Sequence, residues 1–287
     1  IDGACSLIQD QDRCVRQYGA GDGQQLPLPL AKLRPALGQH RVIAIGEAAN
    51  KGVGPGDPMW MTREACAVLE ACPVIAAPQT ASGEMLALSI AQGAAELGGK
   101  TVLPLSFAMS RDAAVRAAGY AHAADAIAPE LDAGRNVAMV NLGDVSIYAT
   151  AYYVLDELRR RGYDTRMVPG VASFSAVAAA LGRSLTEMEL PLHIYPAGAS
   201  DLDAALAQPG TKVLMKSGKA IGETAAALSR HGLAEDSAMV ADCGLPTQQV
   251  FETMTGLPEK ISYFATVIVP DSKELEQPRR LSRRCPS

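Results

Sequence analysis

Aromatic residues are scarce in this 287-residue chain: they make up 5% of it and include a single tryptophan. Hydrophobic residues nevertheless reach 48%, so the core must be built from alanine, valine, leucine, isoleucine and methionine. The scarcity argues against a surface that binds single-stranded nucleic acid by stacking bases on aromatic rings. Charged residues make up 20% of the chain, close to the average for globular proteins, so the sequence predicts a folded protein.

Cysteine and histidine are too scattered to form a disulfide framework or a metal site. None of the six cysteines belongs to a C-x-x-C pair, and the four histidines stand alone. Zinc sites and disulfide-rich folds need closer and more regular spacing, so we expect no metal held by the protein. The residues are Cys5, Cys14, Cys66, Cys72, Cys243, Cys285, His40, His122, His193 and His231.

Long hydrophobic runs are also missing. The longest, at 145–155 and 171–181, are shorter than the ~18–20 residues that a membrane-spanning helix needs. The first residues lack the apolar stretch of a signal peptide. We therefore expect no membrane partner and a cytoplasmic location.

Positive charge is in deficit except near the C-terminal end. The net charge is −5, although residues 277–287 contain four arginines and no acidic residue. The rest of the chain is therefore more acidic than the total suggests, which makes it a poor partner for the phosphate backbone of nucleic acids. We expect no nucleic-acid binding, and a basic tail outside the fold.

Short β-branched runs alternate with longer helical patterns from residue 41 onward. Asp112 is placed to cap a helix, and Gly134 and Gly162 stand where helices end. This alternation predicts an α/β fold with a parallel sheet that helices cover on both faces. The expected strands are 42–45, 74–77, 101–105, 136–141 and 164–168, and the expected helices are 62–71, 83–97, 112–133 and 147–161.

After Pro169 the units become shorter, which predicts a second, smaller α/β domain with a mixed sheet. Its expected strands are 191–195, 211–216, 237–242 and 263–269, and its helices are a small-residue helix ending at Leu181, 220–230 and 246–254. The predicted division of the chain is an extension, disordered or foreign to the fold, over 1–40, an N-terminal domain over 41–169, a C-terminal domain over 170–270 and a basic tail over 271–287.

The densest run of glycine and proline is GVGPGDP at 52–58. Its glycines allow positive φ or the close approach of a ligand, and its prolines stiffen the loop. The spacing fits neither the dinucleotide loop G-x-G-x-x-G nor the phosphate loop G-x-x-x-x-G-K-[ST]. The structural alternative is a tight turn into a helix capped by Asp57 or Thr62.

Two further segments follow predicted strands, where ligands bind in open α/β sheets. GDVSIY at 143–148 offers a glycine and the Asp144 carboxylate, which could bind hydroxyl or ammonium groups or cap the next helix. PGVASFS at 169–175 leads into a helix whose first N–H groups suit a carboxylate or a polar ligand edge. The structural alternative there is that Ser173 caps the helix.

Taken together and in this order, the segments resemble the tetrapyrrole methylase family, the S-adenosylmethionine-dependent methyltransferases of corrin and sirohaem biosynthesis. The resemblance extends from about residue 51 to 269. Within the family, Ser-Ile-Tyr after Gly-Asp and MSRD at 109–112 are most similar to the precorrin-2 C(20)-methyltransferase branch. The motifs are GVGPGDPMWMT (52–62), LGDVSIYAT (142–150), VPGVASFSAVAAALG (168–182) and VLMKSGK (213–219).

The resemblance implies a two-domain fold, S-adenosylmethionine as the cofactor between the domains, a homodimer, and a small-molecule tetrapyrrole as substrate. For this branch the reaction would be C-20 methylation of precorrin-2, or of its cobalt form, in cobalamin biosynthesis. Motif position implies a macrocycle site at Gly54, Pro55 and Gly56. It implies cofactor contacts at Gly143, Asp144, Ile147, Tyr148, Ser173, Phe174, Met215 and Lys216.

Because a sulfonium methyl group is already activated, the main task of the protein would be to place the reactants and exclude water. A weak base for the displaced proton is still expected, and Asp57 and Asp144 are the candidates. The substrate carries several carboxylates, whereas the protein is acidic. We therefore expect Arg63, Arg111 and Lys216 to supply positive charge locally.

Other functions stay open at this stage. One is a methyltransferase of the same fold that acts on another corrin position or on a macromolecule, and another is a binding module without catalysis. The chain also departs from the family in two places. Val145 stands where proline commonly follows Gly-Asp, and residues 47–51 separate the first strand from the glycine loop. Either these residues are an insertion after a genuine first strand, or everything before about Lys51 is foreign to the domain.

Overall fold

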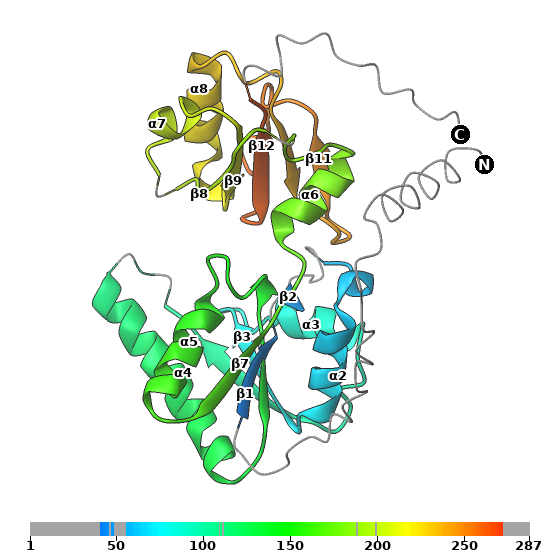
Figure 1. Ribbon diagram of the computed structural model, residues 1–287, viewed down its shortest axis with the longest axis vertical. Helices are drawn as coiled ribbons and strands as arrows, with labels where there is room; N and C mark the ends of the chain where they lie inside the picture. Colours follow the sequence, from blue (N-terminus) through cyan, green and yellow to red (C-terminus); the bar gives the residue numbers. More distant parts are fainter. Residues whose placement is uncertain are drawn as a thin grey trace, which may run out of the picture. The chain divides into compact units, whose positions relative to one another are not determined.

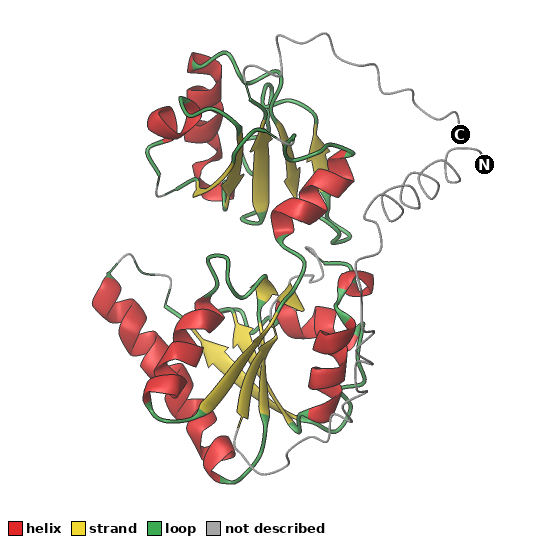
Figure 2. Cartoon of the chain, in the orientation of Figure 1, coloured by secondary structure: helices red, strands yellow, loops and turns green. Residues whose placement is uncertain are grey.

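A computed structural model of the chain describes residues 41–45, 47–48, 56–108, 110, 112–187, 189–198 and 200–271. Two five-stranded sheets with helices packed on them make up this part of the chain (Figures 1 and 2). The predicted extension over 1–40 lies outside the described residues. So do the predicted tail beyond residue 271 and the predicted site residues Gly54, Pro55 and Arg111.

The first sheet is parallel throughout, as predicted, with the strand order β4-β3-β5-β1-β7. Because β1 pairs with both β5 and β7, the first strand is a genuine part of the sheet, and the insertion alternative holds. Part of the insertion is a short strand, β2 (Glu47–Ala48), which pairs with β6 (Leu142–Gly143). The strands are β1 (Arg41–Ile45), β3 (Val74–Gln79), β4 (Thr101–Ser106), β5 (Val137–Val140) and β7 (Asp164–Val168).

Helices cover both faces of this sheet, which buries β3 and β5 completely at their centres. Along β3, Ile75 packs into the cluster formed with α2 (Arg63–Ala71) and α3 (Leu86–Gln92). The neighbouring Val74 and Ala76 pack on the other face, in the cluster formed with α4 (Ala113–Asp132) and α5 (Thr150–Arg160). This alternation of directions is what a strand buried on both sides requires.

The helix ends confirm the capping residues that the sequence predicts. The Asp112 carboxylate accepts a hydrogen bond from the Ala114 N–H at 2.7 Å and caps α4. Gly134 and Gly162 follow α4 and α5 with φ values of 76° and 91°, in the left-handed region that glycine adopts without strain.

The second sheet is mixed, as predicted, with the order β11-β10-β12-β9-β8. Helix α6 (Ser173–Leu181) packs on one face, against Val240 and Ile268, and α7 (Leu202–Leu206) and α8 (Ile221–Arg230) pack on the other. The strands are β8 (Leu192–Pro196), β9 (Thr211–Met215), β10 (Ala238–Ala241), β11 (Gln249–Phe251) and β12 (Ala265–Val269).

Three local predictions need correction. The helix expected over 246–254 is wrong, because residues 249–251 form β11, whose Val250 lies opposite Val240 in β10. The edge of β10 supplies hydrogen-bond partners that the local sequence does not reveal.

The helix expected at 83–97 is limited to α3. The helix expected at 147–161 begins only at Thr150, because Tyr148 has a φ of 49°, which a helix does not allow. Helix α7 was not predicted.

Candidate functional site

The structure brings Tyr148 and Lys216 into contact, two residues predicted to bind the cofactor. The Lys216 Nζ donates a hydrogen bond to the Tyr148 carbonyl oxygen at 3.0 Å and lies 5.9 Å from the centre of the Tyr148 ring. The Tyr148 hydroxyl donates to the carbonyl oxygen of Ile194 in β8 at 2.9 Å. These three contacts fix the end of the Gly143–Tyr148 loop against the middle of β8 and the residue that follows β9.

Both residues are held in a backbone conformation that side chains disfavour. Tyr148 has a φ of 49° and Lys216 a φ of 59°. Such a conformation costs on the order of 1–3 kcal/mol for a non-glycine residue, and it persists only where the surrounding structure enforces it. Because strained positions cluster at functional sites, the pair supports a ligand role for these two loops.

The surroundings of the pair also change its acid–base properties. Desolvation raises the pKa of the Tyr148 hydroxyl, and the neighbouring Tyr195 adds to this shift, so the phenol stays neutral at physiological pH. Desolvation lowers the pKa of the Lys216 amine. Since this amine already binds a carbonyl of its own chain, a substrate carboxylate would have to share or replace that bond. The Tyr148 side chain remains 43% exposed and thus accessible to a ligand.

Asp144 joins the Gly143–Tyr148 loop to the Pro169–Gly170 segment, and we call this link the Asp144 clamp. Its Oδ2 accepts a hydrogen bond from the Gly170 N–H at 2.9 Å, and its Oδ1 accepts from the Ser146 N–H at 2.8 Å and from the Ser146 hydroxyl. The capping alternative for Asp144 is wrong, because α5 has Ala149 at its N-cap without a side-chain hydrogen bond. Both carboxylate oxygens are thus occupied by donors of the chain itself.

Helix α6 begins shortly after Gly170, the residue whose N–H binds Asp144 in the clamp. Ser173 is its first helical residue, and the N-cap is Ala172, which makes no side-chain hydrogen bond. The capping alternative for Ser173 is therefore wrong as well. The first N–H groups of a helix have no partner within the helix, so the N–H groups of Ser173 and Phe174 suit the polar edge of a ligand.

The described end of the glycine–proline segment is a capped turn. Gly56 has a φ of 146°, and the Asp57 carboxylate accepts a hydrogen bond from the Met59 N–H at 2.9 Å, which caps the short helix η1 (Pro58–Trp60). The Thr62 hydroxyl caps α2 through the Ala65 N–H at 3.2 Å and lies 3.4 Å from the Pro169 carbonyl oxygen. Both capping roles that the sequence offered as the structural alternative are therefore present.

Arg63, predicted to pair with substrate carboxylates, is exposed in the first turn of α2. Its neighbour Glu64 forms an ion pair with Arg166 at 3.0 Å. Within the described residues, no hydrogen bond joins Asp57 or Arg63 to the Gly143–Tyr148 loop.

The residues around Lys216 explain the motif VLMKSGK. Met215 is buried at the end of β9, and its carbonyl oxygen accepts a hydrogen bond from the Ala197 N–H at 2.9 Å. Ser217 is fully buried and donates through its hydroxyl to the Leu214 carbonyl oxygen at 2.8 Å. At position 218 a Cβ would lie 2.0 Å from the Ser262 carbonyl oxygen, so only glycine fits there.

Asp242 is a candidate that the sequence reasoning missed. It follows β10 with a φ of 48°, the third positive value of a non-glycine residue in the described chain. Its Oδ2 accepts a hydrogen bond from the Thr247 hydroxyl at 2.9 Å, and its Oδ1 accepts from the Ser262 hydroxyl. The available signal was a polar residue at the carboxyl end of a predicted strand, followed by glycine and proline.

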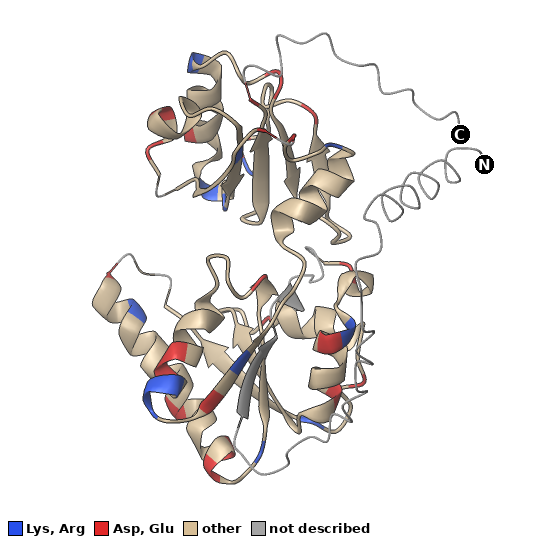
Figure 3. Cartoon of the chain, viewed as in Figure 1, with Lys and Arg blue, Asp and Glu red and all other residues tan. Residues whose placement is uncertain are grey.

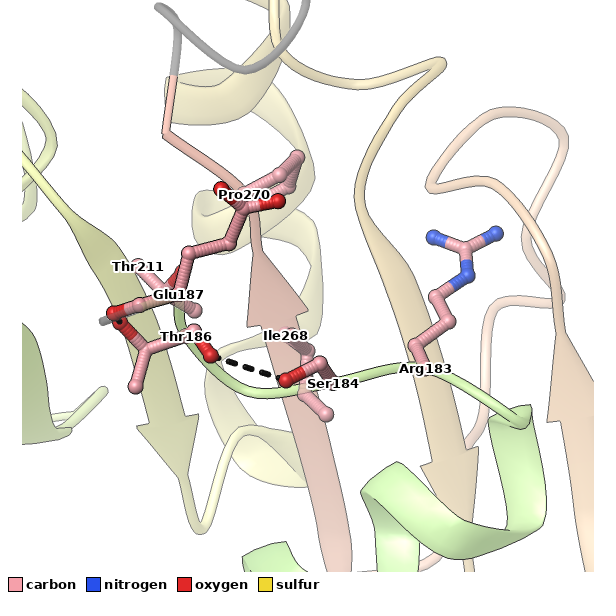
Figure 4. A pocket seen from close by; sticks show the side chains of 7 residues that line it. All are labelled: Arg183, Ser184, Thr186, Glu187, Thr211, Ile268 and Pro270. Atoms are coloured by element: carbon pink, nitrogen blue, oxygen red, sulfur yellow. Dashed lines mark hydrogen bonds between the residues drawn. The ribbon is translucent and has the colours of Figure 1, made fainter. Parts of the chain in front are cut away.

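A hollow of about 300 Å³ lies in the part of the chain that carries the second sheet (Figure 4). None of the predicted site residues lines it. Its Arg183 guanidinium is bound to the Glu252 carboxylate at 2.9 Å, and the Ser184 hydroxyl donates to the Thr186 carbonyl oxygen. The lining residues are Arg183, Ser184, Thr186, Glu187, Thr211, Ile268 and Pro270.

Neither a metal-binding cluster nor a membrane-spanning helix is found among the described residues. No group of three or more histidine, cysteine or acidic side chains comes together there in a way that could hold a metal ion. No helix in the same part of the chain is long and apolar enough to cross a membrane.

Comparison with known proteins identifies the fold and its family. Residues 52–257 match the model of the tetrapyrrole (corrin/porphyrin) methylases. The chain belongs to this family. The match includes the loops of Asp57, Asp144, Ser173, Lys216 and Asp242.

Two relatives of this methylase align with about three-quarters of the chain. The cobalt-precorrin-2 C(20)-methyltransferase of Salmonella typhimurium is 30% identical over 222 residues, which cover 75% of this chain and 92% of that protein. The cobalamin biosynthesis protein CobIJ of Mycobacterium tuberculosis is 32% identical over 235 residues, which cover 77% of this chain. The methylase matches only 45% of the length of CobIJ.

Solved structures of other methylases share the fold. A cobalt precorrin-4 methyltransferase from cobalamin biosynthesis superimposes with a TM-score of 0.60 at 19% identity, covering 80% of this chain and 94% of that one. The uroporphyrin-III C-methyltransferase of Thermus thermophilus, solved in complex with S-adenosylhomocysteine, gives a TM-score of 0.59 at 19% identity and covers 82% of this chain and 99% of its own.

The clamp formed by Asp144 yields a stability prediction. Replacing Asp144 by Asn turns one acceptor into an NH₂ group that faces a donor, either the Gly170 N–H or the donors of Ser146. Leaving a partly buried N–H without a partner costs about 1–3 kcal/mol, so Asp144→Asn should lower the free energy of unfolding by that amount in urea titrations. Ser146→Ala, which keeps the bond to Gly170, should cost less; equal losses in the two variants would contradict the clamp.

Proposed function

We propose that this methylase transfers a methyl group from S-adenosylmethionine to C-20 of precorrin-2, or of its cobalt form, in cobalamin biosynthesis. The observation that carries the proposal is the alignment with the Salmonella cobalt-precorrin-2 C(20)-methyltransferase over nearly its whole length. A precorrin-2 C(20)-methyltransferase of Sinorhizobium, 26% identical over 98% of its length, supports the same position of methylation. The two relatives differ in the metal state of the macrocycle, so both forms are candidate substrates.

We place the cofactor at the loops that follow the carboxyl ends of the strands. When bound, S-adenosylmethionine supplies an electrophilic methyl group on a sulfonium sulfur. We assign its binding to Gly143, whose φ of 86° lies in the region that glycine adopts without strain, and to the half-buried Ile147 and the strained Tyr148 and Lys216. Met215 offers an apolar wall, and the N–H groups of Ser173 and Phe174 in the first turn of α6 offer donors. This set combines the polar and apolar partners that an adenosine and an amino-acid moiety need.

The two candidate carboxylates differ in what their oxygens already bind. Asp144 uses both oxygens for three donors of its own chain. Asp57 binds only the Met59 N–H through Oδ1, and its Oδ2 has no partner among the described residues. As the new carbon–carbon bond forms and the sulfur keeps the electron pair of the broken bond, the methylated carbon must lose a proton. We assign its acceptance to Asp57, and to Asp144 the positioning of the loops.

The macrocycle is assigned to the glycine–proline segment. Gly54, Pro55 and Gly56 would lie along one face of it, and Arg63 and Arg111 would pair with its carboxylates. An exposed arginine such as Arg63 can form two parallel hydrogen bonds with a carboxylate, so it gives orientation as well as affinity.

The reaction itself can be tested by mass spectrometry. Incubating the protein with S-adenosylmethionine and either precorrin-2 or cobalt-precorrin-2 should add a single methyl group to one of them, and NMR of the product should place it at C-20. Methylation at another carbon would show a different corrin methyltransferase. Binding of S-adenosylhomocysteine in calorimetry without methylation of either macrocycle would indicate a binding module or a macromolecular substrate.

The role of Asp57 makes a kinetic prediction. Asp57→Asn keeps an acceptor for the Met59 N–H but removes the base, so kcat should fall by about 100-fold, within the range for general acid–base catalysis, while KM stays within about threefold. Rates measured with saturating cofactor provide the check. Turnover at the wild-type rate would assign the proton to solvent instead.

We also propose that the methylase acts as a homodimer in the cytoplasm, and an aromatic surface on α4 and α5 supports the homodimer. Tyr153 is 51% exposed and stacks on Tyr120 at 4.9 Å between ring centres, next to Tyr152, which is 42% exposed. The exposed first turns of α4 are rich in alanine, and Figure 3 shows one basic band along them. Exposed aromatic surface with few charges is typical of protein interfaces.

A charge placed in this surface should disrupt the dimer. Tyr153→Glu should convert a dimer into a monomer in light scattering after size-exclusion chromatography, because an acidic side chain would be buried against a second copy. Val250→Glu, at a valine that is 42% exposed on the edge strand β11, serves as the control and should leave the mass unchanged. A wild-type monomer, or a dimer in both variants, would contradict the proposed interface.

A further inference from the structure

The one tryptophan of the chain packs against the residues of both sheets. Trp60 ends the short helix η1, three residues after Asp57, and is half-buried. Its side chain contacts the cluster that α2 forms on the first sheet, and it also contacts the cluster of Ala176, Val240 and Cys243 on the second. A single large side chain therefore holds the end of the glycine–proline segment against two cores.

The indole ring lies where a side chain at position 244 would have to be. Gly244 has a φ of 75°, and a Cβ built there would lie 2.9 Å from Cζ3 and 3.1 Å from Cη2 of Trp60. It would also lie 3.3 Å from the backbone nitrogen of Asp57. The close contact thus includes the ring and the backbone of the residue that we assign as the proton acceptor.

Gly244 belongs to a loop, residues 242–248, that is tightly held from within. The Asp242 carboxylate binds the Thr247 hydroxyl, and the Gly244 N–H donates to the Gln248 side-chain oxygen at 2.5 Å. The Asp242 N–H donates to the Phe264 carbonyl oxygen at 3.1 Å. Bonds within the loop and to Phe264 thus give Trp60 a firm support.

The same loop is connected to the residues assigned to the cofactor. Asp242 accepts a hydrogen bond from the Ser262 hydroxyl, and the Ser262 carbonyl group lies against Gly218, two residues after Lys216. In addition, the Lys219 Nζ lies 5.4 Å from the centre of the Tyr263 ring. Lys216 is therefore connected to Trp60 and Asp57 through Gly218, Ser262 and the 242–248 loop.

We propose that Trp60 is a positioning residue for the tetrapyrrole: supported by Gly244, its indole ring fixes Gly56 and Asp57 in the conformation that binds the macrocycle. The inference deepens the proposed function and rests on it. It predicts that moving the ring impairs macrocycle binding in a protein that is still folded and still binds the cofactor. Ordinary core packing would instead lower stability alone.

The test compares two glycine variants that share the same backbone strain. Gly244→Ala pushes a methyl group into the indole ring, whereas Gly256→Ala, at a φ of 64°, has open space around its Cβ. Because small misplacements of reacting groups cost up to about 100-fold, we expect Gly244→Ala to raise the KM for precorrin-2 by about tenfold or more. Gly256→Ala should leave KM within about twofold, and both variants should keep the wild-type affinity for S-adenosylhomocysteine in calorimetry.

A second substitution separates positioning from general damage. Trp60→Phe removes the Cζ3 and Cη2 atoms that the new methyl group would meet, so it should restore the KM of Gly244→Ala to within about threefold of Trp60→Phe alone. Equal KM values for Gly244→Ala and Gly256→Ala, or no relief by Trp60→Phe, would overturn the inference. If the wild type methylates no tetrapyrrole, the proposed function fails; calorimetric binding of precorrin-2 to the same variants would then still decide the role of Trp60.

Discussion

The parallel pairing of β1 with β5 on one side and β7 on the other is the constraint on which the rest of the site depends. Parallel strands end at the same edge of a sheet, so the segments after β5 and β7 emerge there as close neighbours. The hydrogen bond between the Asp144 carboxylate and the Gly170 N–H follows from this placement. This hydrogen bond holds the Gly143–Tyr148 loop beside the segment that leads into α6.

Strain is concentrated where that region meets the second sheet. Among the described residues, the non-glycine residues with positive φ are Tyr148, Lys216 and Asp242, each after the end of a strand. Contacts with distant parts of the chain hold all three: Lys216 binds the Tyr148 carbonyl group, and Asp242 binds the Ser262 hydroxyl. The energy that maintains these conformations comes from the packing of the sheets, which is why a rigid α/β framework can present backbone groups in unusual directions.

Much of the fold could be predicted because it depends on near neighbours in sequence. Asp112 caps α4 through an N–H group two residues away, and alternate residues of β3 face opposite helices because a strand repeats every two residues. Strand β11 could not be predicted in this way. Its residues read as helical by themselves, and only the exposed edge of β10 makes them a strand. The capping roles proposed for Asp144 and Ser173 failed for the same reason, since a distant partner or a shifted helix start took precedence.

The sequence by itself determined the α/β class, the parallel and mixed sheets, the Asp112 cap of α4 and, through its glycine-rich motifs, the family. These features follow from local periodicity and from backbone conformations that few residue types can adopt. Only the tertiary structure decided which side chains meet. Tyr148 contacts Lys216 across 68 positions of sequence, and Trp60 lies on Gly244, far along the chain. Contacts of this kind depend on how two sheets pack, and no local pattern in the sequence encodes that packing.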